Sequence, residues 1–103
     1  MKNKLDEARD MINEIDEEMI SLFIKRMAAV SMIAEYKTEN GLPVFDHTRE
    51  DLIKEKNMQL LSNKVIEPYY NTFLEGVLKA SKDYQKDLMK YYEGLKNKWK
   101  ITH

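Results

Sequence analysis

The sequence predicts an all-α protein with three helices, one long, one short and one long. Two long stretches carry apolar residues at alternating steps of three and four, which is the spacing of one helical face. Only three Gly and two Pro occur among 103 residues. Hydrophobic residues make up 43% of the chain and charged residues 34%, a balance that favours long amphipathic helices over a sheet with many turns. At this length we expect a single domain covering residues 1–103.

The first helix is predicted from about residue 4 to residue 39, a rod about 54 Å long. Neither Gly nor Pro interrupts it, and Asn40-Gly41-Leu42-Pro43 ends it, because Gly favours a helix stop and Pro an extended exit. One step of its apolar face lands on Arg26, so we expect this side chain to face the interior. The apolar positions of this face are Leu5, Ala8, Ile12, Ile15, Met19, Leu22, Ala29, Ile33 and Tyr36.

The second helix is predicted over about residues 48–61. Two residues compete to cap its start: Thr48, which forms a pattern resembling a capping box with Asp51, and Asp46. Its apolar face is supplied by Leu52, Ile53, Met58 and Leu60 or Leu61.

The third helix is predicted over about residues 67–98. Ser62-Asn63-Lys64 precedes it as a turn, and Pro68 suits its first turn. Its apolar stripe consists of Tyr69, Phe73, Val77, Ala80, Tyr84, Leu88, Tyr91 and Leu95.

Charge and cysteine content exclude several functions. Seventeen Lys and Arg against eighteen Asp and Glu give a net charge of −1, so we expect neither a nucleic acid nor a membrane as partner. The absence of Cys rules out a disulfide framework and a thiolate nucleophile, and it fits a cytoplasmic location. No stretch has the roughly 18 apolar residues needed to cross a bilayer. His47 and His103 are far apart in sequence and predict no metal site.

Candidate site residues are the polar groups that interrupt the apolar faces. Arg26 and Lys37 are eleven residues apart, which places them within about 20° of each other on one helix face. Ser81 and Gln85, at i and i+4, border the apolar stripe of the third helix. Asp46, Arg49 and Glu50 lie together at the start of the second helix.

Arg9 also lies on the inner side of the first helix, next to Ile12. It is seventeen residues from Arg26, about 25 Å along the axis, too far for both guanidinium groups of one helix to hold one small molecule. If Arg9 belongs to the site, a second chain must supply it. An antiparallel pairing of two first helices does this and buries their apolar faces, which predicts an intertwined homodimer with two shared sites.

The chain resembles the all-helical chorismate mutases over residues 4 to 88. Each shared fragment alone is weak, but together they keep the family's order and nearly its spacing. The fragments are Leu5-Asp6-Glu7-Ala8-Arg9, Ile12, Ile15-Asp16, Lys25-Arg26, Tyr36-Lys37, Gly41-Leu42-Pro43-Val44, Asp46, Arg49-Glu50, Ser81 and Gln85.

The resemblance implies an isomerase that converts chorismate, a small dianion, to prephenate by a [3,3] rearrangement in aromatic amino-acid biosynthesis. It implies that Arg26 and the partner subunit's Arg9 bind the two carboxylates, with Ser81 assisting. It also implies that Lys37 and Gln85 meet the ether oxygen of the bond that breaks, and that Lys37 touches a carboxylate.

At the other side of the substrate, the resemblance implies that Glu50 and the backbone at Asp46 take the ring hydroxyl. Arg49 lies over the site and orders Glu50. The implied catalytic residues are thus Arg26, Lys37, Glu50 and Gln85, and the reaction needs no cofactor and no metal.

Three other interpretations stay open. Taken singly, each candidate residue is an ordinary surface or helix-face group. Within the same fold, an isochorismate pyruvate lyase uses a similar cationic pocket, although Glu50 with Asp46 at the hydroxyl side favours the mutase. The chain is also compatible with a catalytically silent helical partner of a shikimate-pathway enzyme.

Overall fold

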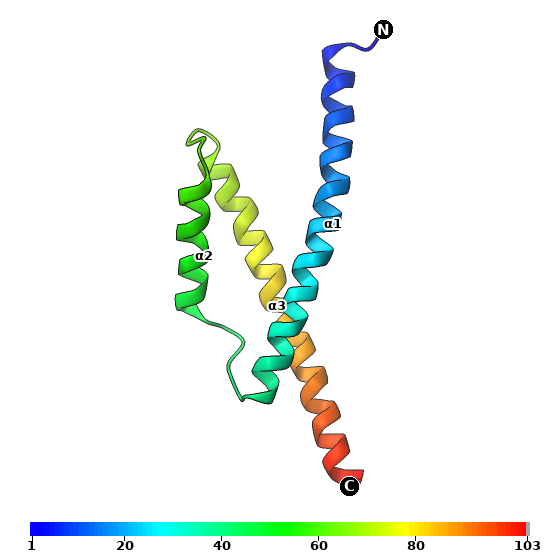
Figure 1. The fold of residues 1–103 in the computed structure, drawn as a ribbon, viewed down its shortest axis with the longest axis vertical. Coiled ribbons are helices and arrows are strands. Elements are labelled where there is room, and N and C mark those ends of the chain that lie inside the picture. Colours follow the sequence, from blue (N-terminus) through cyan, green and yellow to red (C-terminus); the bar gives the residue numbers. More distant parts are fainter. Residues whose placement is uncertain (103) are drawn as a thin grey trace.

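Three helices and no strand make up the described part of the chain, which confirms the predicted all-α class (Figure 1). A computed structural model describes the backbone of residues 1–102 and the side chains of residues 1–99, so His103 lies outside the described residues. The helices are α1 (Lys4–Glu39), α2 (His47–Leu60) and α3 (Glu67–Thr102).

Both ends of α1 are set by local side-chain chemistry. Asn3 caps the start, where its side-chain oxygen accepts a hydrogen bond of 2.9 Å from the backbone N–H of Asp6. At the other end the Asn40 side chain donates to the carbonyl of Tyr36 at 2.8 Å, and Gly41 takes the left-handed conformation with φ of 62°. These bounds coincide with the predicted ones.

The start of α2 resolves the competition between its two candidate caps. Asp46 is the cap, because its carboxylate accepts the backbone N–H of Arg49 at 3.0 Å. Thr48 therefore lies inside the helix. α2 begins and ends one residue earlier than predicted, and none of its residues is buried.

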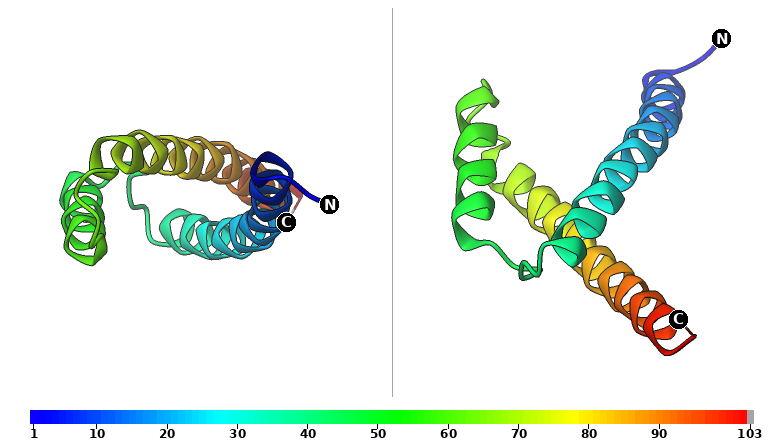
Figure 2. Two further views of the ribbon diagram at one scale, coloured as in Figure 1. Left: turned by 90° about the horizontal axis from the view of Figure 1, so that it is seen from above. Right: turned by 60° about the horizontal axis from the view of Figure 1, so that its bottom comes forward.

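α1 and α3 form two crossed layers, and α2 lies at one side of them (Figure 2). The carboxyl-terminal part of α1 crosses α3, and at this crossing Val30 and Ala34 of α1 and Leu74 and Leu78 of α3 are buried. α3 runs four residues past the predicted end at residue 98. Because the four residues at the crossing are the buried hydrophobic residues of the described part of the chain, the protomer's own core is small.

The chain is long and open. Its radius of gyration is 18.7 Å, against about 13 Å for a compact domain of this length. Its accessible surface is 8588 Å², about 2,500 Å² more than surface scaling gives for a compact monomer of this size. The part of α1 before the crossing projects away from α2 and α3 (Figure 1). It exposes Leu5, Met11, Ile12, Ile15, Met19, Ile20, Leu22, Phe23 and Ile24.

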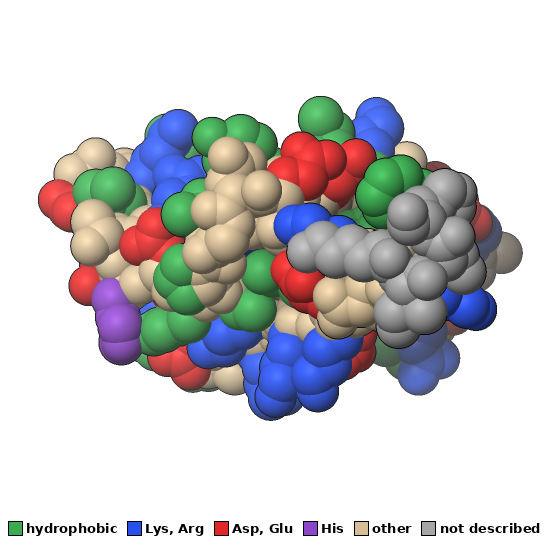
Figure 3. Space-filling model, turned by 90° about the horizontal axis from the view of Figure 1, so that it is seen from below, with side chains coloured by type: hydrophobic (Ala, Val, Ile, Leu, Met, Phe, Trp, Pro, Cys, Tyr) green, Lys and Arg blue, Asp and Glu red, His purple; other side chains and the backbone are tan. Residues whose placement is uncertain are grey.

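The surface carries charges of both signs. On the face drawn in Figure 3, basic and acidic side chains are interspersed among hydrophobic ones. Within the described residues, no helix combines the length and the apolar character needed to span a membrane.

Candidate active site

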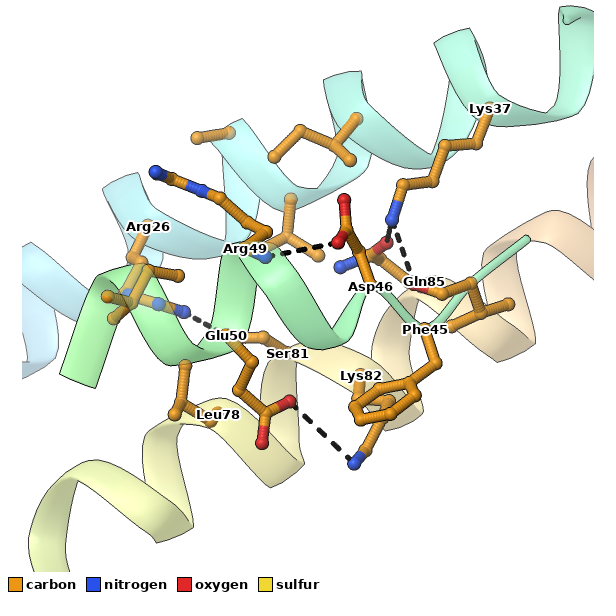
Figure 4. A pocket seen from close by; sticks show the side chains of 15 residues that line it. Arg26, Lys37, Phe45, Asp46, Arg49, Glu50, Leu78, Ser81, Lys82 and Gln85 are labelled. Atoms are coloured by element: carbon orange, nitrogen blue, oxygen red, sulfur yellow. Dashed lines mark hydrogen bonds and ion pairs between the residues drawn. The ribbon is translucent and has the colours of Figure 1, made fainter. Parts of the chain in front are cut away.

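A pocket of about 420 Å³ opens between the carboxyl-terminal half of α1, the connection to α2, the start of α2 and the middle of α3 (Figure 4). Seven of the eight predicted site residues line it: Arg26, Lys37, Asp46, Arg49, Glu50, Ser81 and Gln85. Its apolar lining comes from Ala29, Val30, Ile33, Val44, Ile53 and Leu78, some of which also form the crossing of α1 and α3. The helix crossing that holds the fold together therefore also places the polar groups.

Lys37 is fixed by two acceptors from two different segments. Its ammonium donates to the backbone carbonyl of Val44 and to Oε1 of Gln85, each at 2.8 Å. An ammonium has three N–H donors, so one remains for a ligand. Because Oε1 of Gln85 accepts from Lys37, the amide N–H₂ of Gln85 is the end left to donate.

Arg26 and Ser81 join α1 to α3 across the pocket floor. A guanidinium N–H of Arg26 donates to Oγ of Ser81, and this hydroxyl donates in turn to the carbonyl of Val77 at 2.8 Å. The hydroxyl proton of Ser81 is thus committed to its own helix. In this arrangement Ser81 orients Arg26, whose other N–H groups remain available.

The start of α2 brings acidic groups to the opposite wall. The carboxylate of Asp46 caps the helix by accepting from the backbone N–H of Arg49. The backbone carbonyl of Asp46 accepts from the backbone N–H of Glu50 at 3.0 Å. Glu50 lies between two lysines, with 3.7 Å to the ammonium of Lys54 and 4.0 Å to that of Lys82. Arg49 lines the same wall and is exposed.

The pocket is positively charged within a chain that is nearly neutral. Four cations line it, Arg26, Lys37, Arg49 and Lys82, against the two carboxylates of Asp46 and Glu50. This leaves two excess positive charges, whereas the whole chain carries −1. A small dianion is the ligand that such a local excess favours.

Arg9 is the predicted site residue that does not reach the pocket. It is exposed on the projecting part of α1 and is absent from the residues that line the pocket. Within one chain, the structure therefore keeps Arg9 apart from Arg26, as the helical rise predicts.

Two polar or aromatic lining residues were missed by the sequence analysis, Phe45 and Lys82. The ammonium of Lys82 lies 4.5 Å from the ring centroid of Phe45. Lys82 belongs to a series with Lys79 and Lys86 that reads as a solvated helix face, and Phe45 stands in a loop without periodicity. Their meeting depends on how the loop packs on α3, which no local pattern encodes.

Several known proteins are similar to this chain. The profile of the family described as chorismate mutase type II matches residues 8–86. A bifunctional chorismate mutase/prephenate dehydratase of Buchnera aphidicola subsp. Baizongia pistaciae is 33% identical over 103 residues, 98% of this chain and 27% of that protein. A protein of the same description from Buchnera aphidicola subsp. Schizaphis graminum is 34% identical over 89 residues, 85% of this chain and 23% of that protein. A chorismate mutase of Methanocaldococcus jannaschii is 35% identical over 60 residues, 58% of this chain and 61% of that protein.

The chain spans about a quarter of the length of the two bifunctional relatives. The segment matched by the family profile contains Arg9 and every residue that lines the pocket. No solved structure matches the chain significantly.

Proposed function

Because the chain belongs to the chorismate mutase type II family, we propose that it isomerises chorismate to prephenate. The observation that carries this proposal is the pocket itself, where Arg26, Lys37 and Gln85 lie together with two excess positive charges. The reaction is an intramolecular [3,3] rearrangement in which one carbon–oxygen bond breaks as one carbon–carbon bond forms. No proton, electron or leaving group is exchanged, so the protein must select a conformer and stabilise charge.

Substrate carboxylates are assigned to the guanidinium groups. Arg26 binds one carboxylate with the N–H groups that Ser81 leaves free, and its hydrogen bond to Ser81 keeps it in place before substrate arrives. Arg9 of the partner subunit binds the other carboxylate. Two such clamps hold the side chain of the substrate over its ring and remove rotational freedom ahead of the reaction.

Lys37 and Gln85 are assigned to the ether oxygen, where negative charge grows as the carbon–oxygen bond breaks. Their mutual hydrogen bond of 2.8 Å orients both groups, so that the remaining N–H of Lys37 and the amide N–H₂ of Gln85 are the donors left over. In a water-poor pocket one such donor typically lowers the barrier by about 3 to 4 kcal/mol.

The ring hydroxyl is assigned to the α2 side of the pocket. Glu50 accepts its hydrogen bond, and the backbone N–H of Asp46 donates to it, since the carboxylate of Asp46 is used as the helix cap. Arg49 covers the site and helps to order Glu50. This acidic wall is what favours the mutase over a lyase that uses a similar cationic pocket.

A homodimer with shared sites completes the proposal. Each chain exposes about 2,500 Å² more surface than a compact monomer of its size, which is about 5,000 Å² for two chains. Obligate homodimers bury interfaces of this size. The exposed apolar residues of α1 supply that interface, and the antiparallel pairing delivers Arg9 to the second chain's pocket. We place this enzyme in the cytoplasm, in aromatic amino-acid biosynthesis, in keeping with its lack of Cys.

The direct test is an assay of the purified chain with chorismate and, separately, with isochorismate. We expect the ultraviolet absorbance of chorismate to disappear while prephenate forms, and no salicylate fluorescence from isochorismate. Salicylate formation without prephenate would replace the mutase with a lyase. Failure to turn over either substrate, with a dimer present, would favour the catalytically silent partner.

A further inference from the structure

α2 is attached to the rest of the protomer by few contacts. None of its residues is buried, and its described polar links to α3 lie near its two ends. Near the carboxyl-terminal end, the hydroxyl of Tyr70 donates to Oδ1 of Asn57 at 2.9 Å. Near the amino-terminal end, Lys82 of α3 faces Glu50 at 4.0 Å. The second link lies at the pocket.

Lys82 contacts two segments at once. Its ammonium lies 4.5 Å from the centroid of the Phe45 ring, inside the range of a cation–π interaction, and within ion-pair distance of Glu50 (Figure 4). The Phe45 ring also meets the His47 ring edge to face, with 4.0 Å between the ring centroids. One side chain of α3 thus touches both the loop before α2 and the first turn of α2.

We propose that Lys82 is a positioning residue that holds the loop 42–46 and the carboxylate of Glu50 against α3, and thereby sets the affinity of the pocket for the hydroxyl side of the substrate. This inference rests on the proposed function, because it assigns Lys82 a part in that same site. Lys82 acts through Phe45 and Glu50 and need not touch the reacting atoms.

The two lysines beside Glu50 differ in what they connect. Lys54 is on the same helix as Glu50, so their 3.7 Å contact neutralises charge without tying α2 to another element. Lys82 is on α3, so its contact crosses between helices. Comparing variants of Lys54 and Lys82 therefore separates the effect of a positive charge beside Glu50 from the effect of holding α2 against α3.

Kinetics of four single variants test the proposal. Lys82→Met keeps the length of the side chain and removes its charge, and we expect KM for chorismate to rise about tenfold while kcat changes less than about twofold. Lys82→Arg keeps both contacts, so KM should return to within about threefold of the wild type. Lys79→Met, one turn away and paired with exposed Asp83 at 2.6 Å, is the matched control and should leave both constants unchanged. Lys54→Met should raise KM less than Lys82→Met does.

A double-variant cycle tests whether Lys82 acts through Glu50. If it does, Lys82→Met should raise KM by less than about threefold in a Glu50→Gln background, because the interaction is already lost. Phe45→Leu removes the other contact and should also raise KM with little change in kcat. Effects of Lys82→Met that are equal in the wild-type, Glu50→Gln and Phe45→Leu backgrounds would mean that Lys82 acts through neither neighbour, and would overturn the positioning role.

Hydrogen exchange of the ligand-free protein separates this inference from the proposed function. The backbone N–H groups of Arg49 and Glu50 bond to Asp46, so loosening the loop should expose them. Lys82→Met should exchange faster than the wild type over residues 47–54, and Lys79→Met should not. If the wild type fails to convert chorismate but this difference is seen, the proposed function fails and the attachment stands. Equal exchange in all three proteins, or identical kinetics of Lys82→Met and Lys79→Met, would overturn the inference alone.

Discussion

Mixing two inactive variants is the sharpest test of a site built by two chains. Arg9 and Arg26 are separated by seventeen residues of uninterrupted α1, about 25 Å, and Arg9 is exposed away from the pocket. If Arg9 acts at all, it acts on the pocket of the other chain. Arg9→Ala and Lys37→Ala should therefore each abolish most activity, by damaging different halves of every site.

The expected recovery follows from counting sites. In an equimolar mixture that exchanges freely, half of the dimers contain one subunit of each variant. Such a dimer has one site that combines an intact Lys37 with an intact Arg9 of the partner subunit, and one site that lacks both. About a quarter of all sites are then of wild-type composition, so the mixture should recover about a quarter of wild-type activity.

The assay is the decrease of chorismate absorbance after the two variants are unfolded together, refolded and checked for dimer formation. Mixing Lys37→Ala with Arg26→Ala provides the control, because both changes damage the same half of the site and no intact site can form. Activity in the control mixture, or none in the test mixture, would refute the shared site. Full activity of Arg9→Ala by itself would remove Arg9 from the mechanism.

Three further predictions follow from single side chains. Lys37→Ala should lower kcat by about 10² to 10³-fold with unchanged helical circular dichroism, since a donor to the ether oxygen is lost; a near-normal rate would remove Lys37 from that role. Wild-type kcat should stay roughly flat from about pH 5 to 7, because the amide of Gln85 does not titrate. The kcat of Gln85→Glu should rise as pH falls, because the protonated carboxyl becomes a hydrogen-bond donor. A wild-type kcat that changes steeply in this range would contradict the role of Gln85. Leu74→Ala removes a buried side chain at the crossing and should lower the free energy of unfolding by about 2 to 5 kcal/mol, measured in urea at fixed protein concentration. Leu60 is 73% exposed, so Leu60→Ala should change this free energy by less than about 0.5 kcal/mol. Similar losses in both variants would argue against a core at the crossing.

The helices could be predicted because their signals are local. The absence of Gly and Pro from residue 4 to 39 and the Asn40-Gly41 stop are properties of neighbouring residues, and α1 takes those bounds. The cap of α2 was ambiguous because two suitable residues, Asp46 and Thr48, lie two positions apart. The backbone decides between them, because Asp46 is extended, with φ of −131° and ψ of 99°, whereas Thr48 is already helical. Sequence spacing does not reveal this difference.

The candidate site was predictable where it interrupts an apolar face. Arg26 stands at an apolar step of α1, and Ser81 and Gln85 border the stripe of α3, so helical spacing alone directs them inward. Lys82 gives no such signal, because it lies on the charged face of α3 beside Lys79 and Lys86. It becomes part of the pocket only because the loop before α2 brings Phe45 and Glu50 to it.

The cations of the pocket are held by neutral acceptors in a protomer that is open. Ser81, Gln85 and the carbonyl of Val44 hold Arg26 and Lys37 in place without neutralising their charges. The same acceptors leave part of each cation's donors free, so the two excess positive charges match a dianion before it binds. Such a match is strong only when water is excluded, and one chain leaves this pocket open to solvent. In the proposed homodimer, the α1 helix of the partner subunit would cover the pocket, exclude water from it and add Arg9. The same contact that buries the apolar face of α1 would then complete the site.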